Sequence, residues 1–259
     1  MLNKKLNHLK FIKDSTSVIN RKLKHLKLQM DFTSRINKKL KYLVKLSKTN
    51  LIVKLCCLFL ATDITFILLD LFYTYSGLTS NSNFSLGQDR GYSEIFQYLK
   101  EYWSALLLGF LALKNRSFLY LTWSVMFFYL LLDDAMQIHE RLGNLISNEF
   151  SFVPMFYLRA IDFGELAVSA IVGLLFLIAI TITYGLGDRF AREVSRYLTI
   201  LLFALAFFGI IVDMIHLVFS TSLLEPLLNI VEDGGELMVM SLIICFVFSL
   251  SLQSKKLIE

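Results

Sequence analysis

The run YLTILLFALAFFGIIVDMIHLVFST, residues 197 to 221, determines which kind of fold this chain adopts. It holds no proline, and Asp213 and His216 are its only ionisable side chains apart from Tyr197. As a helix rising about 1.5 Å per residue, the run is longer than the ~30 Å hydrocarbon layer of a bilayer. It therefore predicts a membrane-spanning helix that carries polar side chains toward one of its ends.

The rest of the chain contains more runs of this kind. The sequence is 56% hydrophobic with only 2 prolines in 259 residues, and its mean hydropathy of +0.60 is typical of polytopic membrane proteins. The five further runs cover about 51–75, 95–114, 117–138, 162–185 and 227–252. The run 95–114 is the weakest candidate for a span, because Lys100 and Glu101 lie near its start.

The distribution of lysine and arginine predicts the orientation of these six spans. Short basic loops stay on the cytoplasmic side of a membrane. With six crossings, the basic positions at 1–50, 114–116, 189–196 and 255–256 all fall on one side, whereas five crossings place one set on the wrong side. We therefore expect an all-α, six-helix transmembrane bundle over residues 51–252, with both termini cytoplasmic, a cytoplasmic tail at 253–259, and a bacterial inner membrane as its location.

The first 50 residues form a basic arm. Lysine and arginine are frequent there, Asp14 and Asp31 are its only acids, and three 17-residue repeats align at 2–18, 19–35 and 36–52. Apolar residues recur in each repeat at the spacing of one helical face. Such amphipathic basic helices favour the anionic lipid head groups of the cytoplasmic leaflet over nucleic acid, because lipid also explains the apolar stripe. A transit peptide is an alternative for this region.

Acidic and histidine side chains fall at one depth of the predicted bundle, near its outer face. An Asp at the centre of a spanning helix is penalised by about 2.5–3.5 kcal/mol on insertion scales, so such groups face the bundle interior and pair or bind something. Only Arg141 and Arg159 lie nearby as cations. The candidate metal-binding residues, contributed by the last four spans and the loop after the third, are Asp134, His139, Glu165, Asp213, His216, Glu232 and Glu236.

These residue types predict a divalent metal, either iron, zinc or manganese. In the predicted bundle, two helices each provide an acid and a histidine, and two others each provide a glutamate. This set of side chains resembles the metal ligands of carboxylate-bridged di-metal helix bundles. Asp213-x-x-His216 matches that pattern once, and a single zinc held by His139, His216 and a carboxylate fits equally well. On a continuous helix His139 would point about 120° away from Asp133, so spacing argues against those two acting together.

Several functions remain open at the level of sequence. A metal-dependent membrane enzyme is one; a proton or cation transporter, with Asp63 and Asp70 extending the acidic path inward, is another. A third is a non-catalytic membrane partner that recruits through the basic arm, and internal ion pairs that specify helix packing would also explain the acids. No nucleotide-binding, serine-hydrolase or HExxH motif is present. The apolar inner ends of the spans favour a closed site over a channel.

Overall fold

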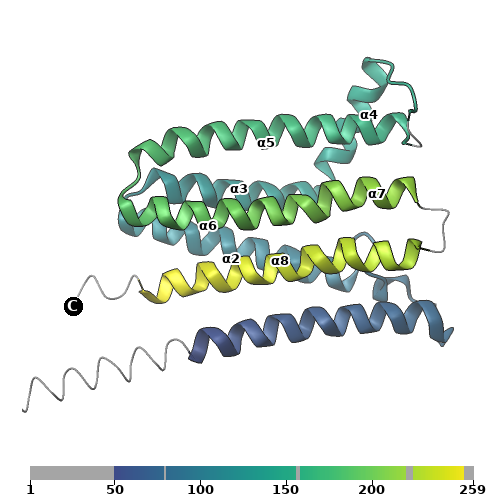
Figure 1. Cartoon of the computed structure of the whole chain (residues 1–259), viewed down its shortest axis with the longest axis horizontal. Helices are drawn as coiled ribbons and strands as arrows, with labels where there is room; N and C mark the ends of the chain where they lie inside the picture. The colour runs from purple at the N-terminus through teal and green to yellow at the C-terminus, as the bar shows by residue number, and fades with distance from the viewer. Residues whose placement is uncertain (1–49, 79, 156–157, 220–223, 254–259) are drawn as a thin grey trace, which may run out of the picture. The chain divides into compact units, whose positions relative to one another are not determined.

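The computed structural model describes residues 50–78, 80–155, 158–219 and 224–253 (Figure 1). Within those ranges every regular element is a helix, and an isolated bridge between Met155 and Leu158 is the one strand-like feature. The predicted all-α class is confirmed; the basic arm with its repeats, and the C-terminal tail beyond Gln253, lie outside the described residues. The helices are Asn50–Ser76, η1 Ser82–Phe84, α2 Tyr92–Asn115, α3 Phe118–Met136, α4 Ile138–Glu149, α5 Ala160–Leu186, α6 Arg189–Ala206, η2 Phe207–Val212, α7 Asp213–Val218 and α8 Glu225–Gln253.

Five of the described helices are long and apolar enough to cross a membrane. They are Asn50–Ser76, Phe118–Met136, Ala160–Leu186, Arg189–Val218 and Glu225–Leu252. The helix Arg189–Val218 starts eight residues before residue 197, the predicted start of this span. It does so because Asp188 caps it, its carboxylate accepting a hydrogen bond from the Ala191 N–H at 2.6 Å. Helix α2, predicted as the second span, is not among the five.

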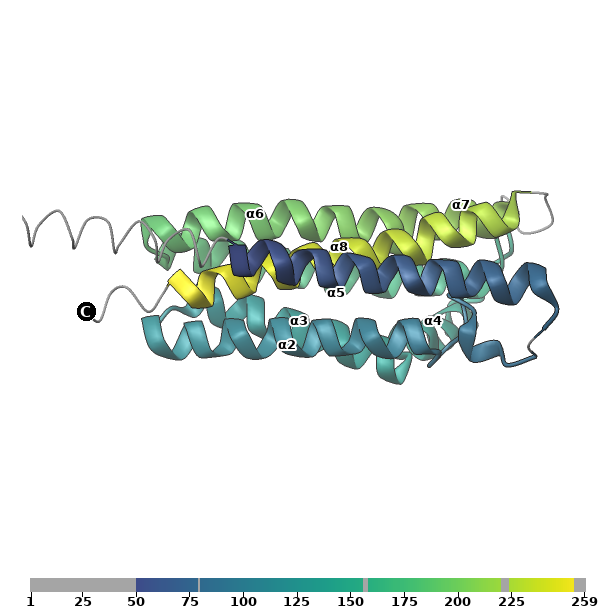
Figure 2. The ribbon, with the colours of Figure 1, turned by 90° about the horizontal axis from the view of Figure 1, so that it is seen from below.

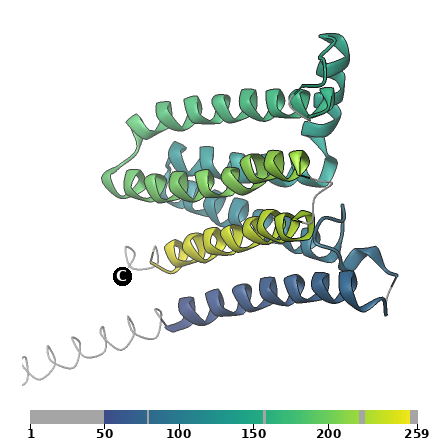
Figure 3. The same ribbon diagram turned by 45° about the vertical axis from the view of Figure 1, so that its right-hand side comes forward.

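The predicted span 117–138 ends early, at Met136. Gln137 adopts a left-handed backbone (φ 54°, ψ 47°), and its N–H bonds back to the carbonyls of Asp133 and Asp134. The chain therefore turns, and the short helix α4, which the sequence analysis did not predict, begins at Ile138. Figure 3 shows α4 at the end of the bundle beside the start of α5.

Helices α4 and α5 touch through two glycines. A Cβ placed on Gly164 would collide with the backbone carbonyl oxygen of Gly143, and a Cβ on Gly143 would lie 2.6 Å from the backbone nitrogen of Glu165. Only glycine at both positions allows this approach. The contact holds the segment that carries His139 against the start of α5.

The apolar core lies in the half of the bundle nearest the α2–α3 and α5–α6 connections. There the Trp123 ring is fully buried and its indole N–H donates to the Ser195 hydroxyl at 2.9 Å. Leu108, Leu198 and Ile243 surround it from α2, α6 and α8. Figure 2 shows these helices side by side along the bundle. The opposite half contains the acidic residues.

Candidate functional site

One polar cavity of about 490 Å³ lies at the end of the bundle opposite the apolar core. The ends of α3 and α7, and the starts of α4, α5 and α8, enclose it. Within the described chain its lining holds nine acidic side chains, two histidines and a single arginine, Arg159. All seven residues predicted as metal ligands line this cavity: Asp134, His139, Glu165, Asp213, His216, Glu232 and Glu236.

His139 and Asp133 interact directly, so the expectation that they point apart is wrong. The His139 backbone N–H donates to Asp133 Oδ1 at 2.9 Å, and His139 Nδ1 lies 3.1 Å from Asp133 Oδ2. The left-handed turn at Gln137 interrupts the helix between them, so continuous helical geometry does not apply. The Asp133 hydrogen bond raises the pKa of His139 to about 9, against the opposing effect of burial.

The second histidine binds a carboxylate from another helix. His216 Nδ1 lies 2.5 Å from Glu232 Oε2, which joins α7 to α8. The carboxyl group of Asp213 lies beside that of Glu232. Two neighbouring carboxyl groups repel each other when both are ionised.

A similar carboxyl pair lies deeper, between α2 and α3. The Glu101 and Asp134 carboxyl groups lie beside each other. Glu101 is only 1% exposed, and its Oε2 atom has no hydrogen-bond partner among the described residues. A buried polar atom without a partner is unfavourable by about 1–3 kcal/mol, so this oxygen is available to a ligand.

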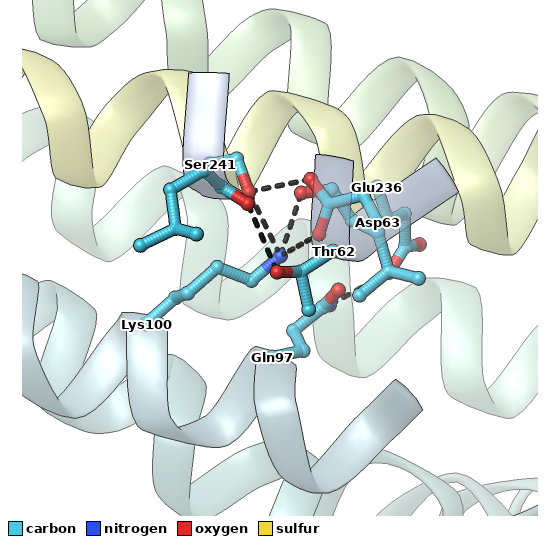
Figure 4. Close-up of polar contacts among 8 residues, drawn as sticks. Thr62, Asp63, Gln97, Lys100, Glu236 and Ser241 are labelled. Carbon is cyan, nitrogen blue, oxygen red and sulfur yellow. Dashed lines mark hydrogen bonds and ion pairs between the residues drawn. The ribbon is translucent and has the colours of Figure 1, made fainter. Parts of the chain in front are cut away.

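Glu236 is held between Gln97 and a glycine. The Gln97 side-chain amide donates to Glu236 Oε2 at 3.0 Å (Figure 4), while Glu236 Oε1 lies where a Cβ on Gly209 would be. Gly209 belongs to the π-helical turn η2, a distortion that frequently marks functional sites. The site prediction did not include Gln97 or Gly209; the signal for Gly209 was a lone glycine in an apolar run, four residues before Asp213.

A buried ion pair lies next to the acidic cavity. Lys100 and Asp63 are completely buried, 3.1 Å apart, and Ser241 hydrogen-bonds to both at 3.2 and 2.5 Å. Figure 4 shows the Lys100 ammonium group pointing toward Asp63 and Ser241. Lys100 also donates to the Leu237 carbonyl at 2.7 Å, and Leu237 lines the cavity. Asp63, considered as an inward continuation of an acidic path, is therefore neutralised by a lysine.

Two further predicted features have a plain structural outcome. Arg159 forms an ion pair with Asp162, with 2.7 Å between Arg159 Nη2 and Asp162 Oδ1. Asp162 is therefore not one of the acids that lack a cationic partner. Among the residues that the structure describes, no group of three or more His, Cys, Asp or Glu side chains is arranged to hold a metal ion. The metal-ligand role of the seven residues thus stays a prediction, although they share one cavity.

The fold and the cavity define an all-helical protein with several helices suited to crossing a membrane and an acidic cavity at one end. A family model described as "Domain of unknown function (DUF8692)" matches residues 51–251. Because this match spans most of the sequence, the chain belongs to that family. No curated protein and no solved structure matches the chain.

Proposed function

We propose that this chain is a six-crossing membrane protein, with both termini cytoplasmic, whose acidic cavity binds a cation from the opposite side. A divalent metal is the cation that its His and carboxylate side chains favour. The observation that carries this proposal is the charge of the cavity lining, in which nine acids face one arginine. Carboxylates at this density repel one another, and a bound cation relieves that repulsion.

The sixth crossing in this proposal is α2. Its 24 residues extend about 36 Å, enough for the ~30 Å hydrocarbon layer. Its polar residues Gln97, Lys100 and Glu101 are buried in the bundle, so their charge does not face lipid. The exposed face of α2 is apolar, with Ile95, Leu99, Trp103, Leu106, Phe110 and Leu113.

Six crossings also explain the distribution of basic residues. Lys114 and Arg116 lie at the end of α2, and Arg189 and Arg192 lie in the first turn of α6. The α2–α3 and α5–α6 connections lie at the same end of the bundle, away from α4 and α7 (Figure 1), whose residues line the acidic cavity. The positive-inside rule assigns that end to the cytoplasm, which leaves the cavity open toward the other side.

The carboxyl pairs explain how a cation enters a site that is not preformed. Asp213 lies beside Glu232, and Glu101 beside Asp134, so each pair repels when both of its carboxyl groups are ionised. A divalent cation displaces any proton that such a pair holds and takes the freed oxygens as ligands, so binding releases protons. The buried Lys100–Asp63 pair next to the cavity favours a closed binding site over a channel.

Titration of the purified full-length protein with Mn²⁺ and Zn²⁺ tests this proposal. We expect saturable binding by calorimetry, with proton release in weak buffer, and affinity weakened about tenfold or more by Asp213→Asn or Glu236→Gln. Glu149→Gln is the matched control, because this acid lies at the far end of α4 and does not line the cavity. Absence of binding by both ions, or equal weakening by the control, would overturn the proposal.

A further inference from the structure

The polar cavity adjoins a second cavity with a different lining. This apolar cavity, of about 280 Å³, lies between α3, α5 and α6. At their junction the two share seven lining residues, which are Gln97, Asp134, His139, Glu165, Gly209, Asp213 and Glu236. Away from that junction the walls of the apolar cavity are hydrocarbon, from Leu130, Val172, Phe176 and Leu202.

The apolar cavity reaches the lipid-facing surface between α5 and α6. Leu177 on α5 and Phe203 on α6 line it, and they are 37% and 59% exposed on the outside of the bundle. An apolar cavity of about 150 Å³ is large enough for benzene, so one of about twice that volume accepts roughly a dozen carbon atoms. An alkyl chain can enter it from the bilayer without crossing water.

The junction of the cavities carries an unsatisfied acceptor. Glu101 lines the apolar cavity, is 1% exposed, and its Oε2 has no hydrogen-bond partner in the described part of the chain. Asp134 and Glu236 lie beside it. A head group that meets these three carboxyl groups must donate hydrogen bonds and carry positive charge, as a protonated amine does with three N–H donors.

We infer that the two cavities together bind a cationic amphiphile, with its amine at their junction, near Asp134, Glu236 and the adjacent Glu101, and its alkyl chain in the apolar cavity. This inference rests on the proposed cation site and names the class of ligand that the site takes. An inorganic cation satisfies the carboxylates but leaves the apolar cavity without an occupant. An anionic head group would meet the acids of the junction as a like charge.

The glycines of α5 provide a matched pair of variants. A Cβ on Gly173 meets nothing within 4 Å and Gly173 lines the apolar cavity, so Gly173→Phe adds a ring at the wall of that cavity with open space at its Cβ. A Cβ on Gly185 also meets nothing within 4 Å, but Gly185 lies outside the cavity near the end of α5. Gly185→Phe therefore controls for an added aromatic ring on the same helix.

The experiment measures equilibrium binding of radiolabelled dodecylamine to the full-length protein in phosphatidylcholine nanodiscs, with empty nanodiscs subtracted. We expect saturable binding that unlabelled dodecylamine displaces and that dodecanol or dodecanoate displaces about tenfold less well. Gly173→Phe should weaken binding by about tenfold or more, with its thermal transition checking that it folds, while Gly185→Phe binds as the wild type does.

Each other result has a definite meaning. Equal displacement by dodecanoate overturns the assignment of a cationic head group. Unchanged binding to folded Gly173→Phe overturns the placement of the chain. Mn²⁺ binding without dodecylamine binding overturns the amphiphile inference but leaves the cation site standing. Dodecylamine binding without Mn²⁺ or Zn²⁺ binding supports the amphiphile site and overturns the divalent-metal proposal, and failure of all three ligands overturns both.

Discussion

Lys100 is completely buried, and its charge is compatible with the bundle interior only because of the groups around it. Asp63 supplies the opposite charge, while Ser241 and the Leu237 carbonyl accept the remaining hydrogen bonds. The pair joins the helix Asn50–Ser76 to α2 and α8. Such a pair adds little to the free energy of unfolding compared with apolar residues of the same volume. Loss of one partner is more harmful, because it leaves the other as an uncompensated buried charge.

Removing one member of this pair should therefore be more harmful than removing both. We expect Lys100→Met to lower the free energy of unfolding by about 3–5 kcal/mol, because Asp63 is then buried alone. The double variant Lys100→Met with Asp63→Leu should recover most of that loss. Unfolding in mixed micelles with increasing denaturing detergent measures both; a double variant as unstable as the single one would contradict this account.

A pH dependence follows from His139. Its folded-state pKa of about 9 lies above the ordinary value of 6.5, chiefly because of the Asp133 hydrogen bond. Protonation therefore stabilises the fold fully below about pH 6.5, and this contribution is lost as the pH rises through about 9. In chelator-treated protein, the unfolding temperature of the wild type should fall across that window more steeply than that of Asp133→Asn. Identical slopes in differential scanning fluorimetry would refute the prediction.

At the scale of elements, the site depends on where helices break and where they touch. The left-handed Gln137 separates α3 from α4, and the π-turn η2 lies just before Asp213 on α7. Both irregularities occur in segments that contribute to the cavity lining. The Gly143–Gly164 contact then fixes α4 against α5, and His139 and Glu165 line the same cavity.

A methyl group at that helix contact should separate α4 from α5. Gly164→Ala places its Cβ against the Gly143 backbone, which has no flexible side chain to move aside, and overpacking of this kind costs about 1–3 kcal/mol. Gly185→Ala, on the same helix with open space at its Cβ, should be neutral or slightly stabilising. Thermal unfolding of both variants measures the difference; equal effects would mean that the contact does not constrain the helices.

For the whole molecule, polarity divides along the bundle axis. The end with the α2–α3 and α5–α6 connections carries Lys114, Arg116 and Arg189 beside the apolar core, and the other end contains the acidic cavity. Under the positive-inside rule, this division supports the proposed orientation, in which the basic end is cytoplasmic. It also accounts for a cavity that opens at one end and is bordered by a buried ion pair.

Cysteine labelling tests the six-crossing arrangement. In a variant without the native cysteines, Asn148→Cys at the cavity end should react with a membrane-impermeant maleimide in intact cells. Asn115→Cys and Arg189→Cys, at the basic end, should react only after permeabilisation; all three positions are exposed. If α2 did not cross and the N-terminus stayed cytoplasmic, the pattern would invert: Asn115→Cys and Arg189→Cys would react in intact cells and Asn148→Cys only after permeabilisation, which is the outcome that contradicts six crossings.

Sequence alone determined the features that depend on local composition and length. Apolar runs of about 20 residues or more predicted the all-helical class and most helix boundaries to within a few residues, because each helix satisfies its own backbone hydrogen bonds. Charge placement likewise predicted which ionisable residues would gather: Asp134, His139, Glu165, Asp213, His216, Glu232 and Glu236 line one cavity.

Only the tertiary structure decided how those residues pair. The His139–Asp133 contact depends on a left-handed residue that helical periodicity does not reveal, and the Lys100–Asp63 pair joins positions 37 residues apart. The apolar cavity also had no signature in the sequence, since its walls come from α3, α5 and α6. Contacts between distant segments depend on how helices dock, and many dockings satisfy the same apolar pattern, so side-chain shape and the glycine contacts select among them.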